Sequence, residues 1–155
     1  MEDYSAEGAW PVEDLKAYFS GHWTLSRTMN DLKLNMPGAM EGLASFSLAE
    51  FEDGLSGLLY HENGELRFGD YREDVNRSYQ YIIREPRSAD IRFDDRRFFY
   101  HLDLTSGRCL MEHQCGDDMY RGRIRVDNED VWRISWFISG PRKEIVLDTR
   151  YHRNV

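Results

Sequence analysis

Apolar and polar residues alternate along most of this chain with a period of two. In residues 21–29, Trp23, Leu25 and Met29 share one face of the segment with Arg27. Successive side chains of a β-strand point to opposite faces, so this pattern predicts a strand with one buried face. The same alternation recurs in ten further segments, at residues 39–49, 56–62, 65–72, 76–85, 89–94, 97–104, 108–115, 118–127, 130–139 and 142–153.

Turn-forming residues separate these predicted strands. Glycine, proline, asparagine and aspartate gather at 36–38, 62–64, 94–95, 106–107 and 127–129, where they favour tight reversals of the backbone. Short strands joined by hairpin-length turns predict an up-and-down antiparallel sheet, and a sheet of about ten strands curls and closes. We therefore expect an all-β fold, an up-and-down antiparallel β-barrel of about ten strands.

One short helix is expected before the first strand. Pro11 suits the first turn of a helix, and the acidic Glu13 favours its positive end. Leu15, Tyr18 and Phe19 then lie on one apolar face, which the helix would bury against the barrel. The sequence thus predicts a helix that ends just before residue 20.

Length and charge limit the classes of protein that fit. The chain has 155 residues, which suits one domain, and we expect a flexible acidic arm at 1–10 followed by a single barrel at 11–155. It carries 20 Lys and Arg against 28 Asp and Glu, a net charge of −8, which argues against nucleic-acid and anionic-membrane partners. No apolar run approaches about 18–20 residues, and no signal-peptide pattern opens the chain, so we expect a cytoplasmic protein.

The last predicted strand carries charge on its apolar face. Lys143, Tyr151 and Arg153 share that face with Ile145 and Leu147. A buried charge is costly unless it is paired, so these cations require either a structural carboxylate or a ligand. The same alternation places further polar residues on inner faces, namely Arg27, Tyr60, Glu62, Arg77, Tyr79, Tyr81, His113, Asp118 and Tyr120.

Several short motifs follow one another in a recognisable order. They are Gly21-X-Trp23 with Arg27, Gly42-X-Ala44-X-Phe46, Tyr60-X-Glu62, Arg77-X-Tyr79, Phe93-Asp94, Phe99-X-His101-Leu102-Asp103, His113-X-Cys115, Asp118-X-Tyr120, Gly140-Pro141-Arg142-Lys143 and Tyr151-X-Arg153. From about Leu15 to Arg153 the pattern resembles an uncharacterised family of small microbial lipocalin-like proteins, domain-of-unknown-function family 6314. The resemblance implies a calycin-type barrel and no established activity.

The resemblance also implies how the barrel closes. In lipocalin-like barrels an arginine near the last strand often packs over the tryptophan of Gly-X-Trp, and Arg153 or Arg150 would be that arginine here. The chain departs from the family pattern after Phe93, where Asp94-Asp95-Arg96 stands in place of an aspartate followed by glycine.

The inward cations allow two interpretations. Arg27, Arg77, Lys143 and Arg153 could together bind a carboxylate or a phosphate, for which arginine offers a two-pronged hydrogen-bonding group. Alternatively, Arg153 stacks on Trp23 as a structural cation–π contact, and the other cations pair with inward carboxylates such as Glu62 and Asp118. By count, the cations exceed the clear inward carboxylates, which favours an anion in the barrel.

The two histidines in the motifs also leave alternatives open. His113 is a core histidine, an acid–base group, or an axial ligand of haem as in nitrobindin-type barrels. His101 shares a face with Asp103, but the opposite face of 97–104, with Tyr100 and Leu102, is equally apolar. Either face of that strand could therefore point inward.

Together these features predict a barrel that binds a small organic molecule, either anionic or polar-aromatic. Its ligand-binding residues would be Arg27, Tyr60, Arg77, Tyr79, His101, Tyr120, Trp136, Tyr151 and Arg153. The first alternative is a cofactor-independent cyclase, isomerase or lyase in which His113 is the acid or base, while Lys143 or Arg153 stabilises an anion. The second is a haem barrel with His113 as axial ligand. We expect no metal site, no cofactor apart from that haem alternative, and a monomer or homodimer.

Overall fold

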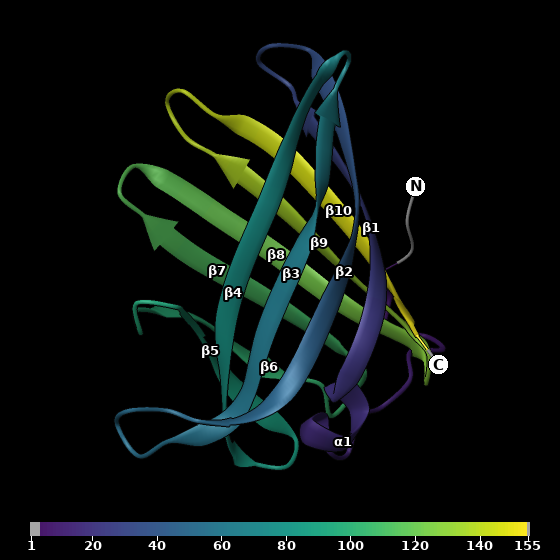
Figure 1. The fold of residues 1–155 in the computed structure, drawn as a ribbon, viewed down its shortest axis with the longest axis vertical. Coiled ribbons are helices and arrows are strands. Elements are labelled where there is room, and N and C mark those ends of the chain that lie inside the picture. Colours follow the sequence, from purple (N-terminus) through teal and green to yellow (C-terminus); the bar gives the residue numbers. More distant parts are fainter. Residues whose placement is uncertain (1–3, 155) are drawn as a thin grey trace.

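Ten antiparallel strands form a nearly closed barrel in the computed structural model, which describes residues 4–154 (Figure 1). A single short helix, α1 (Leu15–Phe19), precedes them. The strands are β1 (Gly21–Asp31), β2 (Met36–Glu50), β3 (Ser56–Phe68), β4 (Tyr71–Glu85), β5 (Ser88–Phe93), β6 (Phe98–Asp103), β7 (Arg108–Cys115), β8 (Asp118–Asn128), β9 (Val131–Ser139) and β10 (Glu144–Arg153). The predicted all-β, up-and-down barrel is confirmed.

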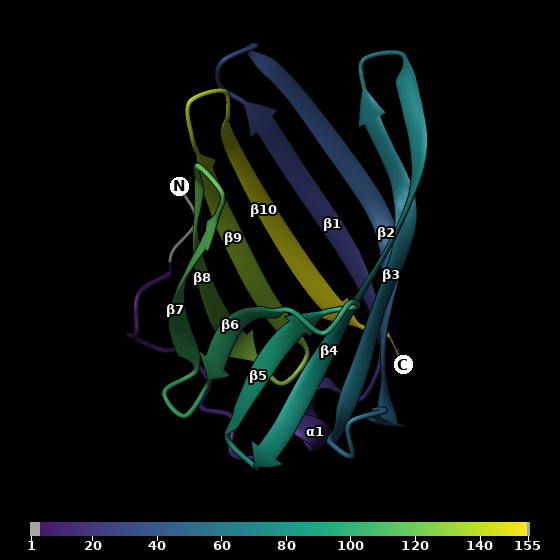
Figure 2. The same ribbon diagram turned by 90° about the vertical axis from the view of Figure 1, so that its left-hand side faces the viewer.

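The first and last strands pair with each other. The hydrogen-bonded order is β6-β5-β4-β3-β2-β1-β10-β9-β8-β7, so the two edges of the sheet are β6 and β7 (Figure 2). These edge strands are consecutive in sequence, yet no ladder joins them. The wall therefore has one seam, and side chains rather than backbone hydrogen bonds must hold it.

The predicted turn at residues 62–64 is wrong. β3 runs without a break through these residues, and the reversal comes at Gly69, whose φ of +55° suits a turn. Gly64 instead lies directly opposite Gly42 of β2. A Cβ atom on Gly64 would lie 2.5 Å from the backbone oxygen of Glu41, so glycine is required here for close approach of two strands.

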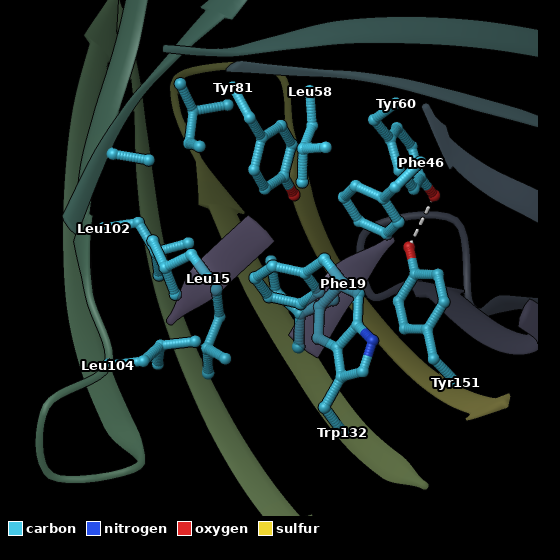
Figure 3. Close-up of a cluster of buried hydrophobic side chains, with 14 of the residues drawn as sticks. Leu15, Phe19, Phe46, Leu58, Tyr60, Tyr81, Leu102, Leu104, Trp132 and Tyr151 are labelled. Carbon is cyan, nitrogen blue, oxygen red and sulfur yellow. Dashed lines mark hydrogen bonds between the residues drawn. The ribbon is translucent and has the colours of Figure 1, made fainter. Parts of the chain in front are cut away.

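Helix α1 plugs one end of the barrel. It is shorter than predicted and begins after Asp14, whose carboxylate accepts a hydrogen bond of 3.1 Å from the backbone N–H of Ala17. Its apolar face is confirmed, because Leu15 and Phe19 are fully buried. Phe19 stacks on Phe46, with ring centroids 4.8 Å apart (Figure 3). We call this the closed end of the barrel.

The segment before the helix covers the seam at the closed end. The backbone N–H of Trp10 donates to the carbonyl of Val126 at 2.9 Å, and that of Val12 donates to the carbonyl of Leu104 at 3.0 Å. A Cβ atom on Gly107 would lie 2.5 Å from the carbonyl oxygen of Trp10, so glycine lets the segment approach. Within residues 4–154 no helix has the length and apolar character needed to cross a membrane.

Replacing Arg96 with glycine is expected to stabilise the barrel. Arg96 lies in the turn after β5 with a φ of +74°, a conformation that costs a non-glycine residue roughly 1–2 kcal/mol. After the added chain entropy of glycine, the gain should be about 0.5–1 kcal/mol, measured as a higher denaturant midpoint. Arg142→Gly, in an exposed turn without positive φ, is the control and should not stabilise.

Candidate functional site

Five polar side chains form a buried layer across the middle of the barrel. Arg27 and Glu62 make two parallel contacts, from Nη1 to Oε2 at 2.8 Å and from Nη2 to Oε1 at 2.9 Å. The Tyr60 hydroxyl donates to Glu62 at 2.6 Å and lies 2.7 Å from the Tyr151 hydroxyl, as Figure 3 shows for the two tyrosines. Arg27 Nε also donates to Thr149 at 2.7 Å. We call these five residues the polar layer.

The hydrogen-bond donors of the polar layer can be assigned by counting protons. A tyrosine hydroxyl has one proton, and that of Tyr60 goes to Glu62, so Tyr151 must donate to Tyr60. Burial alone would raise the pKa of Glu62, but the hydrogen bond and charge of Arg27 outweigh it and hold that pKa below its usual value. Glu62 and Arg27 are thus both ionised, and their charges cancel.

Beyond the polar layer, the inner face carries a group of rings that are only partly buried. Phe99 is the buried member at its centre and stacks on Trp136 at 5.0 Å and on Phe93 at 4.5 Å. The ring of His113 meets Phe99 edge-on at 5.1 Å. We call the whole set the aromatic cluster: Tyr79, Phe93, Phe99, His113, Tyr120 and Trp136.

The aromatic cluster spans the seam of the barrel. Phe99 comes from β6, whereas His113, Tyr120 and Trp136 come from β7, β8 and β9. The ring of Trp136 lies over Gly122, where a Cβ atom would come within 2.6 Å of it. Contacts between aromatic rings therefore hold β6 against β7–β9, whereas backbone hydrogen bonds join the other neighbouring strands of the barrel.

Arg77 lies beside the aromatic cluster and, among the described residues, has no carboxylate as an ion-pair partner. Its Nη1 donates to the Tyr79 hydroxyl at 3.3 Å, and its backbone lies opposite Glu62. Within residues 4–154 no carboxylate forms an ion pair with it, because Glu62 is taken by Arg27. Arg77 is exposed, so its guanidinium is available to an anion that reaches the inner face.

A known family accounts for most of the chain. The profile of the Family of unknown function (DUF6314) matches residues 19–153. The chain belongs to this family. No functionally curated protein matches this DUF6314 member in sequence.

Two solved structures resemble the DUF6314 barrel in fold. The S-type phycobiliprotein lyase from Guillardia theta superposes with a TM-score of 0.67 at 12% identity, over 100% of this chain and 99% of the lyase. A protein of unknown function from the DUF3598 family of Nostoc punctiforme has a TM-score of 0.60 at 11% identity. That match covers 95% of this chain and 51% of the other, so the DUF6314 chain spans about half its length. At these identities the likeness concerns the fold alone.

The structure brings most of the predicted ligand-binding residues of this DUF6314 chain onto the inner face. Arg27, Tyr60 and Tyr151 lie in the polar layer, and Tyr79, Tyr120 and Trp136 lie in the aromatic cluster with Arg77 beside it. The sequence-based analysis missed Phe93 and Phe99 as members of the site. Their signal was the apolar alternation of β5 and β6, which does not distinguish a site from a core.

His101, one of the expected ligand-binding residues, is not on the inner face. Its side chain is exposed, and Nδ1 lies 2.8 Å from the carboxylate of Asp90, which also pairs with Arg84 at 2.8 Å. The register between β5 and β6 shifts after Ile91. This irregularity turns both Phe99 and Tyr100 inward and leaves His101 outside.

Lys143 and Arg153 do not meet in one site. Lys143 lies in the turn before β10, where its exposed ammonium pairs with Asp118 at 3.5 Å. Arg153 lies at the closed end with its guanidinium 4.3 Å from the ring of Trp23, and it donates to the carbonyls of Tyr18 and Glu129. Arg153 is therefore the arginine that packs over Trp23, and it lies outside both the polar layer and the aromatic cluster.

His113 and Arg153 are far apart along the barrel. Tyr120, which is opposite His113, pairs through Ile138 with Ile145 of β10, eight residues before Arg153. At roughly 3.3 Å per residue that offset is about 26 Å. The hypothesis that Arg153 stabilises an anion formed near His113 is therefore wrong on geometry.

His113 is the residue that could act as an acid, a base or an axial haem ligand. Its ring is half-buried, and no hydrogen bond to either nitrogen is recorded among the described residues. Free nitrogens fit each of these roles. Within residues 4–154 there is no group of three or more His, Cys, Asp or Glu placed to hold a metal ion.

Proposed function

We propose that this barrel binds a small, flat aromatic molecule that carries a carboxylate. The aromatic cluster carries the proposal, because five of its six rings face the inside of the barrel and still remain partly exposed. A barrel filled by its own side chains would bury such rings. Stacking on aromatic faces suits a planar ligand, and lined concave sites with few polar groups are typical of small-molecule binding.

The proposed anionic group follows from the charges of the inner face. Arg27 and Glu62 neutralise each other, whereas Arg77 keeps its positive charge next to Tyr79. A ligand carboxylate would pair with Arg77, and its ring would lie along Tyr79 and the neighbouring members of the cluster. One of the solved structures with a similar fold is named a phycobiliprotein lyase, and so a barrel of this shape can support chemistry as well as binding.

Replacing Arg77 with methionine is expected to weaken binding by about 10- to 100-fold, the range for losing a hydrogen bond to a charged group. Isothermal titration with a panel of aromatic carboxylates and tetrapyrroles would measure it. Arg72→Met is the matched control, because Arg72 lies on the outer face of the same strand, where it pairs with Glu65. This variant should bind the aromatic carboxylates as tightly as the unaltered chain does. No saturable binding anywhere in the panel would count against the proposal.

A catalytic role for His113 is the second candidate, favoured by its ring nitrogens, which lack hydrogen-bond partners among the described residues. If a bound compound is turned over, His113→Ala should lower the rate at least about 100-fold while binding persists. Equal loss of both would show that His113 only shapes the site. If haem binds, His113 would hold it and the haem would supply iron-centred redox or ligand-binding chemistry; a Soret band lost in His113→Ala would reveal it.

A further inference from the structure

Four aliphatic side chains lie on the inner face of β9, β10 and β1, three strands that are side by side in the sheet (Figure 2). Met29 is directly opposite Leu147, and Ile145 is directly opposite Ile138. Leu147 and Ile145 share the face of the buried Tyr151 on β10, and directly opposite residues project from the same face of a sheet. We call these four residues the aliphatic wall: Met29, Ile138, Ile145 and Leu147.

The aliphatic wall adjoins the aromatic cluster. Leu147 is directly opposite Trp136, and Ile138 is directly opposite Tyr120. Side chains in such pairs have Cβ atoms about 4.5–5.5 Å apart, so the aliphatic groups and the rings form one continuous surface. The wall also begins two residues beyond Thr149 of the polar layer, on the side away from the closed end.

The wall is not part of the packed core of the barrel. Met29, Ile145 and Leu147 are only partly buried, although they face the inside. Among the described residues, the connected core at the closed end includes no member of the wall. Partly exposed aliphatic side chains gain free energy when another apolar group covers them, and they offer almost nothing to a polar one.

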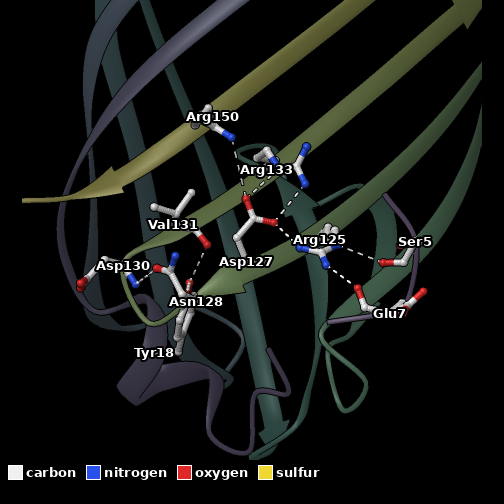
Figure 4. A network of polar contacts seen from close by, with 10 residues as sticks. All are labelled: Ser5, Glu7, Tyr18, Arg125, Asp127, Asn128, Asp130, Val131, Arg133 and Arg150. Carbon is white, nitrogen blue, oxygen red and sulfur yellow. Dashed lines mark hydrogen bonds and ion pairs between the residues drawn. The ribbon is translucent and has the colours of Figure 1, made fainter. Parts of the chain in front are cut away.

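The outer face of the neighbouring strands shows a different chemistry. There Asp127 contacts Arg125 and accepts hydrogen bonds of 2.9 and 3.0 Å from Arg133 (Figure 4). Charged groups that pair with one another thus meet water on the outside of β8 and β9. An apolar part of a ligand is therefore accommodated by the inner face of these strands and not by their outer face.

The chemistry of the inner face changes in a fixed order around the barrel. Arg77 and Tyr79 lie on β4, the other rings of the cluster follow on β5–β9, and the wall occupies β9, β10 and β1. A cation is followed by rings and then by aliphatic groups. A ligand that follows this order has a carboxylate, then a ring, then an alkyl group.

We propose that the ligand is an aromatic carboxylate that carries an alkyl substituent on the ring edge opposite the carboxylate, and that the aliphatic wall binds this substituent. The inference rests on the proposed function, which places the carboxylate at Arg77 and the ring on the aromatic cluster. A flat aromatic acid without the substituent would leave the wall uncovered, whereas an alkyl group would bury it.

Isothermal titration of the unaltered chain with three acids tests the class of ligand. Para-butylbenzoate should bind at least about 20-fold more tightly than benzoate, because each fully buried methylene group raises affinity by about fourfold. Para-carbamoylbenzoate, whose substituent is polar, should bind no more tightly than benzoate, because the wall offers its amide no strong hydrogen-bonding partner.

Matched variants of β10 test the place of the substituent. Leu147→Asn should reduce the gain from the butyl group to about fivefold or less and leave the affinity for benzoate unchanged. Val146→Asn alters the adjacent aliphatic residue, which lies on the outer face opposite Phe137, and should keep the whole gain. Arg77→Met should weaken both acids by the same factor, because they share the carboxylate.

The outcomes separate this inference from the proposed function. If benzoate binds but the butyl group adds nothing, or if Leu147→Asn keeps the whole gain, the wall does not bind an alkyl group, and the proposed function still stands. If no acid binds saturably, both are overturned. Should Leu147→Asn fail to fold, Ile145→Asn takes its place, and the comparison of the three acids needs only the unaltered chain.

Discussion

Replacing Glu62 with leucine is expected to lower the free energy of unfolding by about 3–5 kcal/mol. Glu62 is 1% exposed and accepts three hydrogen bonds, two from Arg27 and one from Tyr60. Its removal leaves a buried guanidinium without its counter-charge and a hydroxyl without its acceptor. Denaturant unfolding followed by circular dichroism would measure the loss.

A matched control exists on the same strand. Glu65 pairs with Arg72 at 3.4 Å, but its side chain is 52% exposed, so Glu65→Leu should change stability by no more than about 1 kcal/mol. The double variant Arg27→Met, Glu62→Leu should recover much of the loss, because an apolar pair can replace a buried ion pair. If Glu62→Leu is no less stable than Glu65→Leu, the polar layer does not stabilise the barrel as stated.

The acid dependence of stability follows from the same residue. The pKa of Glu62 is lower in the folded barrel than in the unfolded chain, where it is about 4.3. Its stabilising contribution is therefore present above about pH 4.3 and is lost as the pH falls through the folded-state pKa. The double variant should show a shallower loss of stability in that acidic range than the unaltered chain.

Replacing Phe19 with alanine is expected to cost about 3–5 kcal/mol. The ring is fully buried in the plug at the closed end, stacked on Phe46 and edge-on to Tyr81 and Trp132 at 5.8 and 5.1 Å. Its loss leaves a cavity between the helix and the strands, which cannot collapse because the wall is hydrogen-bonded. The midpoint of urea unfolding would report the change.

Phe98→Ala is the control for the plug. Phe98 belongs to β6 but is 55% exposed, so its replacement should change stability by about 0.5 kcal/mol or less. Similar losses for the two variants would mean that Phe19 does not anchor the closed end.

The inner face was largely predictable from the period-two pattern. Trp23, Tyr60, Glu62 and Trp132 fall where the alternation places them, because a strand with one buried face must put its apolar residues on one parity. The pattern did not decide which face of 97–104 points inward, because an irregularity between β5 and β6 changes the parity there. Such a shift depends on the partner strand, and so it leaves no trace in the alternation of one segment.

The partners of the charged residues were not predictable. Parity placed Arg27, Arg77 and Arg153 on one face, but it could not show that Arg27 meets Glu62 35 residues away while Arg153 meets Trp23. The apparent excess of inward cations consequently shrank to Arg77. Contact between distant residues is set by strand order and register, which the local pattern does not encode.

The sequence by itself determined most of the strands, most of their buried faces and the all-β class, because alternation and turn residues act locally. Only the tertiary structure decided which aromatic rings pack together and which partner each charged side chain contacts. Closure of the sheet between β1 and β10 brings Arg153 over Trp23, and stacking across the seam gathers Phe99, His113 and Trp136. Those contacts join segments far apart in the chain, and so they exist only once the barrel has closed.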